Sequence, residues 1–359
     1  FFVPTGILIR KSLLFYLIIM FPFRKWHFPK WLSKPIIIEE YQFVSDNRRI
    51  ISDVYRPKDK RQYPGMIVFA PLAKEGRHNP LIVNFLKGLA RLGYTVTAPF
   101  WPARKLGNVY PTDIKDFATA VKWFKNQPHV VDKPLGIVAV SYGTGPALLA
   151  IKKYHLEKNI KYLVLVSGYI DLFSTIKTLI TKHFQYKNIH GKLNPEPYAY
   201  TVLLKTAADW SQNIKDKKIF TRISQNIKND FTIDQLSQKS LGLTKEGQKI
   251  LKLYLSKTNK MFLGQYQKLP LRIHNFFKKL SPQSQQSFPQ VPTLILHSKK
   301  DHLIPYTESV KLYDLIKKKT ESTLVIIDAF DHTMPVPANF KNIFCYFSSE
   351  SFYTTLCII

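Results

Sequence analysis

Five short segments of this chain are apolar almost without interruption, and they constrain the fold more than any other feature. A strand with one face in water alternates apolar and polar residues, whereas a continuous apolar run indicates a strand buried on both faces. The runs are GMIVFAP (65–71), YTVTAP (94–99), GIVAVS (136–141), YLVLVS (162–167) and TLILHS (293–298). They predict a mostly parallel sheet that is covered by helices on both faces.

Three helical patterns, with apolar residues at three-to-four spacing, lie between the first four of these strands, at 80–92, 112–126 and 143–155. Ahead of them, IIIEEYQFV (36–44) and RIISDVYR (49–56) flank Ser45-Asp46-Asn47, a turn signal, and predict a hairpin. Alternating strands and helices are typical of the α/β class.

The alternation stops near Gly168 and resumes near Val291. From 172 to 290 the chain has 20 Lys or Arg against 6 acidic residues, with amphipathic pieces at 246–256 and 268–280 and no good strand. We therefore expect a helical cap inserted at 168–290, and a core domain formed by 35–167 together with 291–350.

Residues 1–34 form a separate segment. LLFYLIIMFPF (13–23) has no charge and is flanked by basic residues and tryptophans. A membrane-spanning helix needs about 20 apolar residues, so the length favours a peripheral anchor in the bilayer interface. A helix packed on the protein and the core of a signal peptide are the alternatives.

The charge balance raises the question of polyanionic partners, because 53 Lys plus Arg stand against 24 acidic residues, a net charge of +29. Only 11 of these cations are Arg, the side chain on which bidentate reading of phosphates and bases depends. We therefore do not expect nucleic-acid binding. Cys345 and Cys357 match no metal motif, and we expect them to be free thiols.

The strand at 136–140 runs directly into Ser141 and then into small residues that open a helix, LGIVAVSYGTGPALLA (135–150). In a nucleophile elbow of the G-x-S-x-G type, the residues two before and two after the serine must be small, because the strand and helix backbones crowd there. Here these residues are Ala139 and Gly143. The pattern predicts a nucleophilic hydroxyl held above a helix N-terminus, where amide donors favour a developing oxyanion.

Two further candidate catalytic residues follow the serine in the order that such a site uses, an acid and then a histidine. TLILHSKKDHLIP (293–305) is a strand followed by a loop with Asp301, and STLVIIDAFDHTMP (322–335) is a strand followed by a loop with His332. An amphipathic helix, 307–318, fills the interval. All three side chains should lie at the carboxyl ends of strands of one sheet, where open α/β folds build their sites.

With these motifs, the chain resembles the α/β-hydrolase family with a helical cap, over roughly residues 36–350. The resemblance depends on AVSYG, KKDHLIP and FDHTMP. It implies that Ser141 is the nucleophile, that His332 is the general base and then acid, and that Asp301 orients the imidazole. Ala139 replaces a commoner glycine, and Asp331 stands where glycine often precedes the histidine, so that its carboxylate could compete for His332.

The family's oxyanion hole uses the backbone N–H of the residue after the nucleophile, here Tyr142, and a second N–H from the loop after the third strand. That loop reads VFAPLAKEGRH, and alignment places the second donor on Leu72, with Ala73 as the fallback. Pro71 has no N–H and is excluded.

Other residues offer rival interpretations. Asp171 follows the strand that ends at Ser167 and is the alternative acid. His302 is expected at the surface or in a supporting position, His297 in the core and His155 at the surface. Ser141 as a simple helix cap in an inactive protein is the non-catalytic alternative. Several aromatic residues of the cap fit either an apolar substrate pocket or the cap's own core, namely Tyr198, Tyr200, Trp210, Phe262, Phe276 and Phe277.

The sequence thus predicts a serine hydrolase that cleaves a carboxylic ester, or an amide or thioester, through an acyl-enzyme, with neither a metal nor an organic cofactor. A small-molecule or lipid-like ester is the expected substrate, and a cytoplasmic location with peripheral membrane contact is expected. The alternatives are a non-catalytic membrane or polyanion binder on the same scaffold and an acyltransferase that uses the same residues.

Overall fold

The structure is a computed structural model of the 359-residue chain. It describes residues 34–72, 75–101, 107–227, 235–236, 242–285, 288–327, 330–332 and 334–335. Residues 1–33 of the predicted N-terminal segment lie outside the described residues, as do Cys345 and Cys357, and the predictions made for them stay predictions. In the part of the chain that is described, no helix combines the length and the apolarity needed to cross a bilayer.

The first two strands, β1 (Ile36–Ser45) and β2 (Arg48–Pro57), form an antiparallel hairpin. The turn residues Asp46 and Asn47 have φ angles of 53° and 59°. Two successive positive φ angles give a turn whose twist matches that of the flanking strands, and Asp and Asn tolerate this region better than most residues. The predicted hairpin is confirmed.

Six further strands complete one eight-stranded sheet: β3 (Gly65–Phe69), β4 (Thr95–Thr97), β5 (Leu135–Val140), β6 (Ile160–Val166), β9 (Thr293–Ser298) and β10 (Ser322–Ile327). The order is β1-β2-β4-β3-β5-β6-β9-β10. β2 is antiparallel to both of its neighbours, β1 and β4, and every neighbouring pair from β4 to β10 is parallel. The apolar runs of the sequence are the buried strands of this sheet, which confirms the α/β class.

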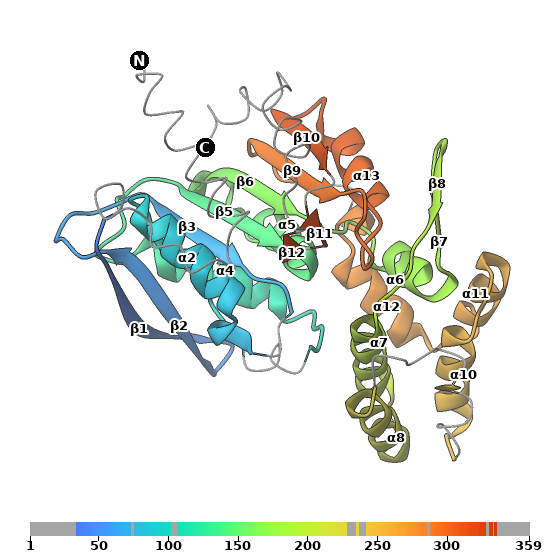
Figure 1. Ribbon diagram of the computed structural model, residues 1–359. Helices are drawn as coiled ribbons and strands as arrows, with labels where there is room; N and C mark the ends of the chain where they lie inside the picture. The colour runs from blue at the N-terminus through green and yellow to red at the C-terminus, as the bar shows by residue number, and fades with distance from the viewer. Residues whose placement is uncertain are drawn as a thin grey trace.

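Helices cover both faces of the sheet (Figure 1). On one face, α2 (Pro80–Arg91) packs Leu86 and Leu89 against residues of β3 and β5. The other face is covered by α4 (Asp113–Lys125), α5 (Thr144–Lys153) and α13 (Thr307–Ile316). Short 3₁₀ turns, η1 (Gly76–His78), η2 (Ser141–Gly143), η3 (Glu157–Asn159) and η5 (Pro282–Gln285), adjoin these elements. The two-residue strands β11 (Phe330–Asp331) and β12 (Met334–Pro335) follow β10 and pair with each other.

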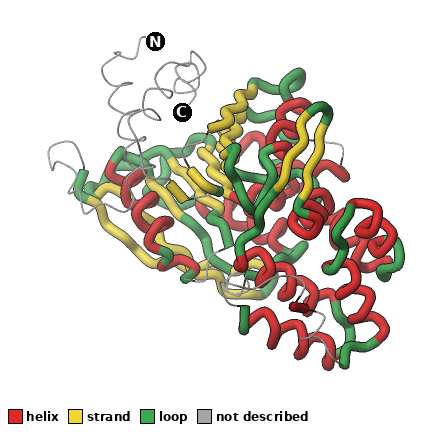
Figure 2. The backbone as a smooth tube through the Cα atoms, turned by 45° about the vertical axis from the view of Figure 1, so that its right-hand side comes forward, coloured by secondary structure: helices red, strands yellow, loops and turns green. Residues whose placement is uncertain are grey.

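Between β6 and β9 the chain forms the cap: α6 (Leu172–Thr181), β7 (His183–Tyr186), β8 (Ile189–Lys192), α7 (Pro197–Trp210), α8 (Ile214–Gln225), α10 (Lys245–Tyr254), α11 (Asn259–Tyr266) and α12 (Leu271–Leu280). Figure 2 shows its helices gathered on one side of the molecule, beyond the sheet.

The hairpin of β7 and β8 differs from the expectation of a cap without strands. Each strand has four residues, too few for a clear alternating pattern. Contacts with the core domain hold it instead: the ring of Phe184 lies edge-on to Tyr306 at 5.9 Å, and the hydroxyl of Tyr186 donates to Asp314 on α13 at 3.1 Å.

Some aromatic residues of the cap lie in its own core, and others line a cavity between the cap and the sheet. Trp210 packs against Phe277 with ring centroids 5.2 Å apart, and Phe262 and Tyr200 are buried with them. Only two of the six aromatic residues singled out in the sequence line the cavity, namely Tyr198 and Phe276.

Candidate active site

Ser141 lies on the sharp turn between β5 and α5, and its backbone has a φ of 55°. This left-handed conformation costs a residue with a side chain about 1 to 3 kcal/mol, and it persists where the surrounding structure over-determines it. The surroundings here are tight. A Cβ atom at Gly143 would lie 2.8 Å from the carbonyl oxygen of Phe69, and Ala139 is fully buried between β3 and β6. The small residues of the motif are therefore a packing requirement of the turn.

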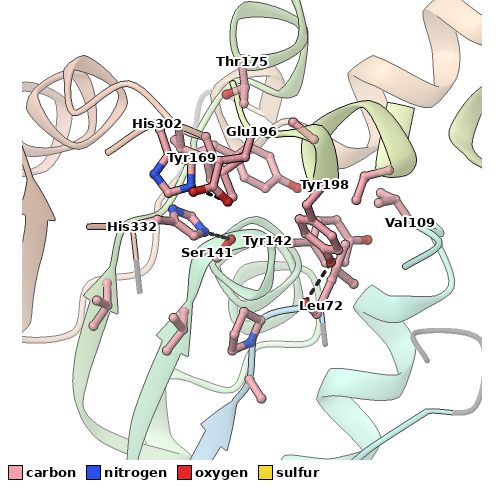
Figure 3. A pocket seen from close by; sticks show the side chains of 18 of the residues that line it. Leu72, Val109, Ser141, Tyr142, Tyr169, Thr175, Glu196, Tyr198, His302 and His332 are labelled. Carbon is pink, nitrogen blue, oxygen red and sulfur yellow. Dashed lines mark hydrogen bonds and ion pairs between the residues drawn. The ribbon is translucent and has the colours of Figure 1, made fainter. Parts of the chain in front are cut away.

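His332 is a turn residue directly after β11, and it also has a positive φ, 46°. Its Nε2 is 2.8 Å from Oγ of Ser141, a contact drawn as a dashed line in Figure 3, and its Nδ1 is 2.8 Å from Oδ2 of Asp301. The ionised carboxylate can only accept a hydrogen bond, so Nδ1 carries the hydrogen and Nε2 is free to accept one from the serine hydroxyl. The structure thus brings together three residues that are 160 and 31 positions apart in the sequence.

Asp301 follows β9, and its side chain has no exposed surface. Its Oδ1 accepts hydrogen bonds from the backbone N–H groups of Leu303, at 2.8 Å, and Ile304, at 2.9 Å. Burial alone would raise the pKa of Asp301, but the imidazole of His332 and hydrogen bonds from His297 and His332 outweigh it and hold this pKa well below its usual range. Asp301 therefore stays ionised while it faces His332.

The rival acid, Asp171, has a different role. It is the N-cap of α6, where its carboxylate accepts from the N–H of Phe173 at 3.0 Å and from the hydroxyl of Ser281 at 3.3 Å. Burial raises the pKa of Asp171, and the nearby carboxylate of Glu308 raises it further. The carboxylate in contact with the imidazole of His332 is that of Asp301.

The residues expected to form the oxyanion hole line the same cavity as Ser141. Tyr142 begins the helical turn after the serine, and its phenol hydroxyl donates to Asp113 at 3.0 Å. Leu72 follows β3, and its carbonyl accepts from the hydroxyl of Tyr198 at 2.9 Å (Figure 3). A residue of the cap therefore holds the loop on which the second donor is expected. Ala73, the fallback donor, lies outside the described residues.

The cavity has a volume of about 630 Å³, and Ser141 and His332 lie in its wall. Most of its lining residues are apolar. The sheet and α2 contribute one side, with Val140, Leu296 and Phe85, and the cap contributes the other, with Ile176 and Phe276. Ligand pockets of about 300 to 1,000 Å³ with mainly apolar walls are typical of small-molecule sites.

Asp331 does not compete for His332 as its position in the sequence suggested it could. Its Oδ1 lies 2.6 Å from Nδ1 of His302, whose Nε2 lies 3.3 Å from a carboxylate oxygen of Glu196. These three side chains are also close enough to one another to be considered for a metal ion. Both ring nitrogens of His302 already face a carboxylate, one on each side of the ring. We therefore interpret the group as a polar contact between the cap and the core domain.

Two supporting residues were not identified as such in the sequence. Ser167, at the end of β6, donates from its hydroxyl to the carbonyl of His332 at 2.6 Å. His297, expected in the core, is fully buried there, but its Nε2 also lies 3.2 Å from Oδ2 of Asp301. No sequence pattern marks a serine or histidine at a strand end for such a contact.

No protein-family model matches the sequence, and no curated protein matches it. Among solved structures, an acylaminoacyl peptidase of Pyrococcus horikoshii is similar, with 14% identity and a TM-score of 0.46 over 83% of this chain. The chain spans only 38% of that peptidase's length.

A bacterial brefeldin A esterase, described as a homologue of human hormone-sensitive lipase, has 12% identity and a TM-score of 0.47, and the match covers 98% of this chain and 83% of the esterase. A hypothetical protein of Pseudomonas aeruginosa has 16% identity and a TM-score of 0.47, with 88% and 92% of the two chains covered. Likeness at this level does not identify a substrate.

Proposed function

We propose that the protein is a serine hydrolase that cleaves a carboxylic ester, because a serine, a histidine and an aspartate at the ends of strands of one mostly parallel sheet lie in hydrogen-bond contact. The observation that supports this most directly is the double contact of His332, with Ser141 on one ring nitrogen and Asp301 on the other. A serine that only capped a helix would not need a buried base with an oriented carboxylate behind it.

The proposed chemistry follows from these contacts. Oγ of Ser141 attacks the ester carbonyl carbon while its proton passes to Nε2 of His332. The tetrahedral oxyanion takes hydrogen bonds from the backbone N–H groups of Tyr142 and Leu72. His332 then gives its proton to the leaving alcohol, which leaves an acyl group on Ser141. Water, deprotonated by His332, attacks that acyl group, and the protonated His332 then returns its proton to Oγ of Ser141 as the carboxylic acid is released.

The cavity supports an apolar substrate without hydrogen-bond donors near the scissile bond. An amide N–H or a peptide backbone that enters an apolar cavity must find partners or lose the free energy of its bonds to water. The apolar walls formed by the sheet, α2 and the cap favour an ester, which has no N–H group. They also favour a hydrocarbon acyl or alcohol group over a charged one.

A fluorophosphonate probe tests the nucleophile. We expect the wild-type protein to be labelled at Ser141, and Ser141→Ala to be neither labelled nor active while retaining the wild-type circular dichroism spectrum and melting temperature. The residual activity should be lower by a factor of about 10⁴ or more. An unlabelled wild-type protein would support the non-catalytic binding alternative, and an active Ser141→Ala would exclude Ser141 as the nucleophile.

A substrate series tests the cavity. For p-nitrophenyl esters of increasing acyl length, we expect kcat/KM to rise by about fourfold per methylene group, from about 0.8 kcal/mol of burial each, until the cavity is full. The matching p-nitroanilides should react much more slowly. Preference for the shortest ester, or equal rates on anilides, would contradict the proposed substrate class.

A further inference from the structure

A second histidine lies behind the carboxylate of Asp301. His297 is the next-to-last residue of β9, and its side chain has no exposed surface. Its Nδ1 lies 2.7 Å from Oγ of Ser309 on α13. Its Nε2 lies 2.9 Å from the carbonyl oxygen of Ile304 and 3.2 Å from Oδ2 of Asp301. The mechanism proposed above makes no use of this buried and fully hydrogen-bonded imidazole.

These neighbours determine which nitrogen of His297 carries a hydrogen. The carbonyl oxygen of Ile304 and the carboxylate of Asp301 can only accept hydrogen bonds. A lone pair on Nε2 would face two acceptors at short distance without water to separate them. Nε2 therefore carries a hydrogen, which it donates to the carbonyl of Ile304 at 2.9 Å while it also faces the carboxylate of Asp301 at 3.2 Å, and the hydroxyl of Ser309 is the partner of Nδ1.

We propose that His297 is a positioning residue that holds the carboxylate of Asp301 in line with His332. The proposal rests on the serine hydrolase function inferred above. Asp301 has room for about four hydrogen bonds to its two oxygens. Its Oδ1 accepts from the two backbone N–H groups of its loop, and its Oδ2 lies 2.8 Å from Nδ1 of His332 and 3.2 Å from Nε2 of His297. With four donors in place, the carboxylate has one orientation.

The contact also has an electrostatic consequence. The groups that face Asp301 are the two imidazoles and the two backbone amides, and His332 in turn faces Ser141 and lies 6.1 Å, centroid to centroid, from the ring of His302, which is paired with Asp331. Oδ2 of Asp301 carries the negative charge that stabilises a protonated His332. Each hydrogen-bond donor to Asp301 reduces the negative charge available to His332. Removal of the His297 donor should therefore favour protonated His332 and extend its inactive form to higher pH.

The test compares His297→Leu, which removes the donor, with His297→Gln, whose side-chain N–H can take the place of Nε2. Ile295→Ala is the control, because Ile295 is a buried residue of the same strand whose truncation destabilises the protein through a cavity. The readouts are the rate of fluorophosphonate labelling against pH and the low-field proton NMR signal of the hydrogen bond between His332 and Asp301.

For His297→Leu we expect labelling to slow by roughly 10- to 100-fold, the range for one charge-assisted hydrogen bond, and its acid midpoint to rise by about 0.5 pH unit. The NMR signal should shift or broaden. His297→Gln should restore most of the rate, and Ile295→Ala should change only the melting temperature.

Two results would overturn the proposal. One is His297→Leu with a wild-type labelling rate, midpoint and NMR signal. The other is His297→Leu with the same pattern as Ile295→Ala, which would show a packing role only. If labelling fails in the wild type as well, the proposed function fails, and the NMR signal in the free protein still decides whether His297 positions Asp301.

Discussion

The two loops that follow β9 and β10 carry two aspartate–histidine pairs, and the pairs cross: Asp301 contacts His332, while its neighbour His302 contacts Asp331. The nitrogen–oxygen distances are similar, 2.8 Å and 2.6 Å. The environments are not. The side chains of the first pair are 0% and 8% exposed, and in the second pair Asp331 is 42% exposed and His302 16%.

This difference teaches that burial, and not distance, separates the candidate catalytic pair from the second pair, which lines the same cavity with its carboxylate open to solvent. A solvent-exposed ion pair is screened and contributes about 0 to 1 kcal/mol. A buried carboxylate without partners is costly, and Asp301 has four donors that offset this cost. Of the two pairs, only the buried one also contacts the hydroxyl of a serine, Ser141, whose backbone has a strained, positive φ.

Substitution of each histidine by glutamine should give the largest difference in kcat between the two pairs. His332→Gln removes the base that accepts the proton of Ser141, and kcat should fall by a factor of about 10⁴ or more. His302→Gln leaves that base in place and should lower kcat less than about fivefold, because His302 lines the cavity wall without contacting Ser141 and its two carboxylate partners are partly exposed to solvent. Steady-state kinetics on a p-nitrophenyl ester measures both, and equal losses would abolish the distinction between the pairs.

The two aspartates should differ next. Asp301→Asn keeps the shape of the side chain but removes the charge that fixes the tautomer of His332, and we expect kcat/KM to fall by about 10³ to 10⁴. Asp331→Asn should cost no more than about threefold, since its partner is His302. A large loss in Asp331→Asn with an active Asp301→Asn would reverse our assignment of the acid.

The smallest expected effect is on the pH dependence of the free energy of unfolding. The pKa of Asp301 is lowered in the folded protein, so the stability it contributes is present above its unfolded pKa of about 3.9 and is lost as the pH falls toward the folded pKa. The difference in free energy of unfolding between wild type and Asp301→Asn should be on the order of 2 kcal/mol from pH 5 to 7 and should shrink below pH 4.

Asp171→Asn is the control of opposite sign for this measurement. Burial raises the pKa of Asp171, so the folded protein binds its proton more tightly, and the wild type should lose stability relative to Asp171→Asn as the pH rises above about 4. Urea unfolding curves between pH 3 and 7 would show both trends. Parallel curves for the two variants would contradict the opposite environments of the two carboxylates.

Much of the fold could be predicted from local patterns. The apolar runs became the parallel strands, and the turn at Asp46 and Asn47 formed the hairpin. The small residues Ala139 and Gly143 indicated the crowded turn at Ser141, and a Cβ on Gly143 would indeed meet the backbone of β3. Backbone sterics and two-sided burial are properties of neighbouring residues, and the sequence records them directly.

The partners of the polar side chains could not be predicted in this way. The sequence predicted that Asp301 faces His332, but nothing in it says that Asp331 pairs with His302 and not with its neighbour His332. Nor does it show that His297 lies behind the carboxylate, or that the β7–β8 hairpin rests on α13. Each of these contacts depends on where loops distant in the chain meet and on which atoms are shielded from water. Hydrogen-bond direction and burial arise only in the folded state, and so the tertiary structure alone decided them.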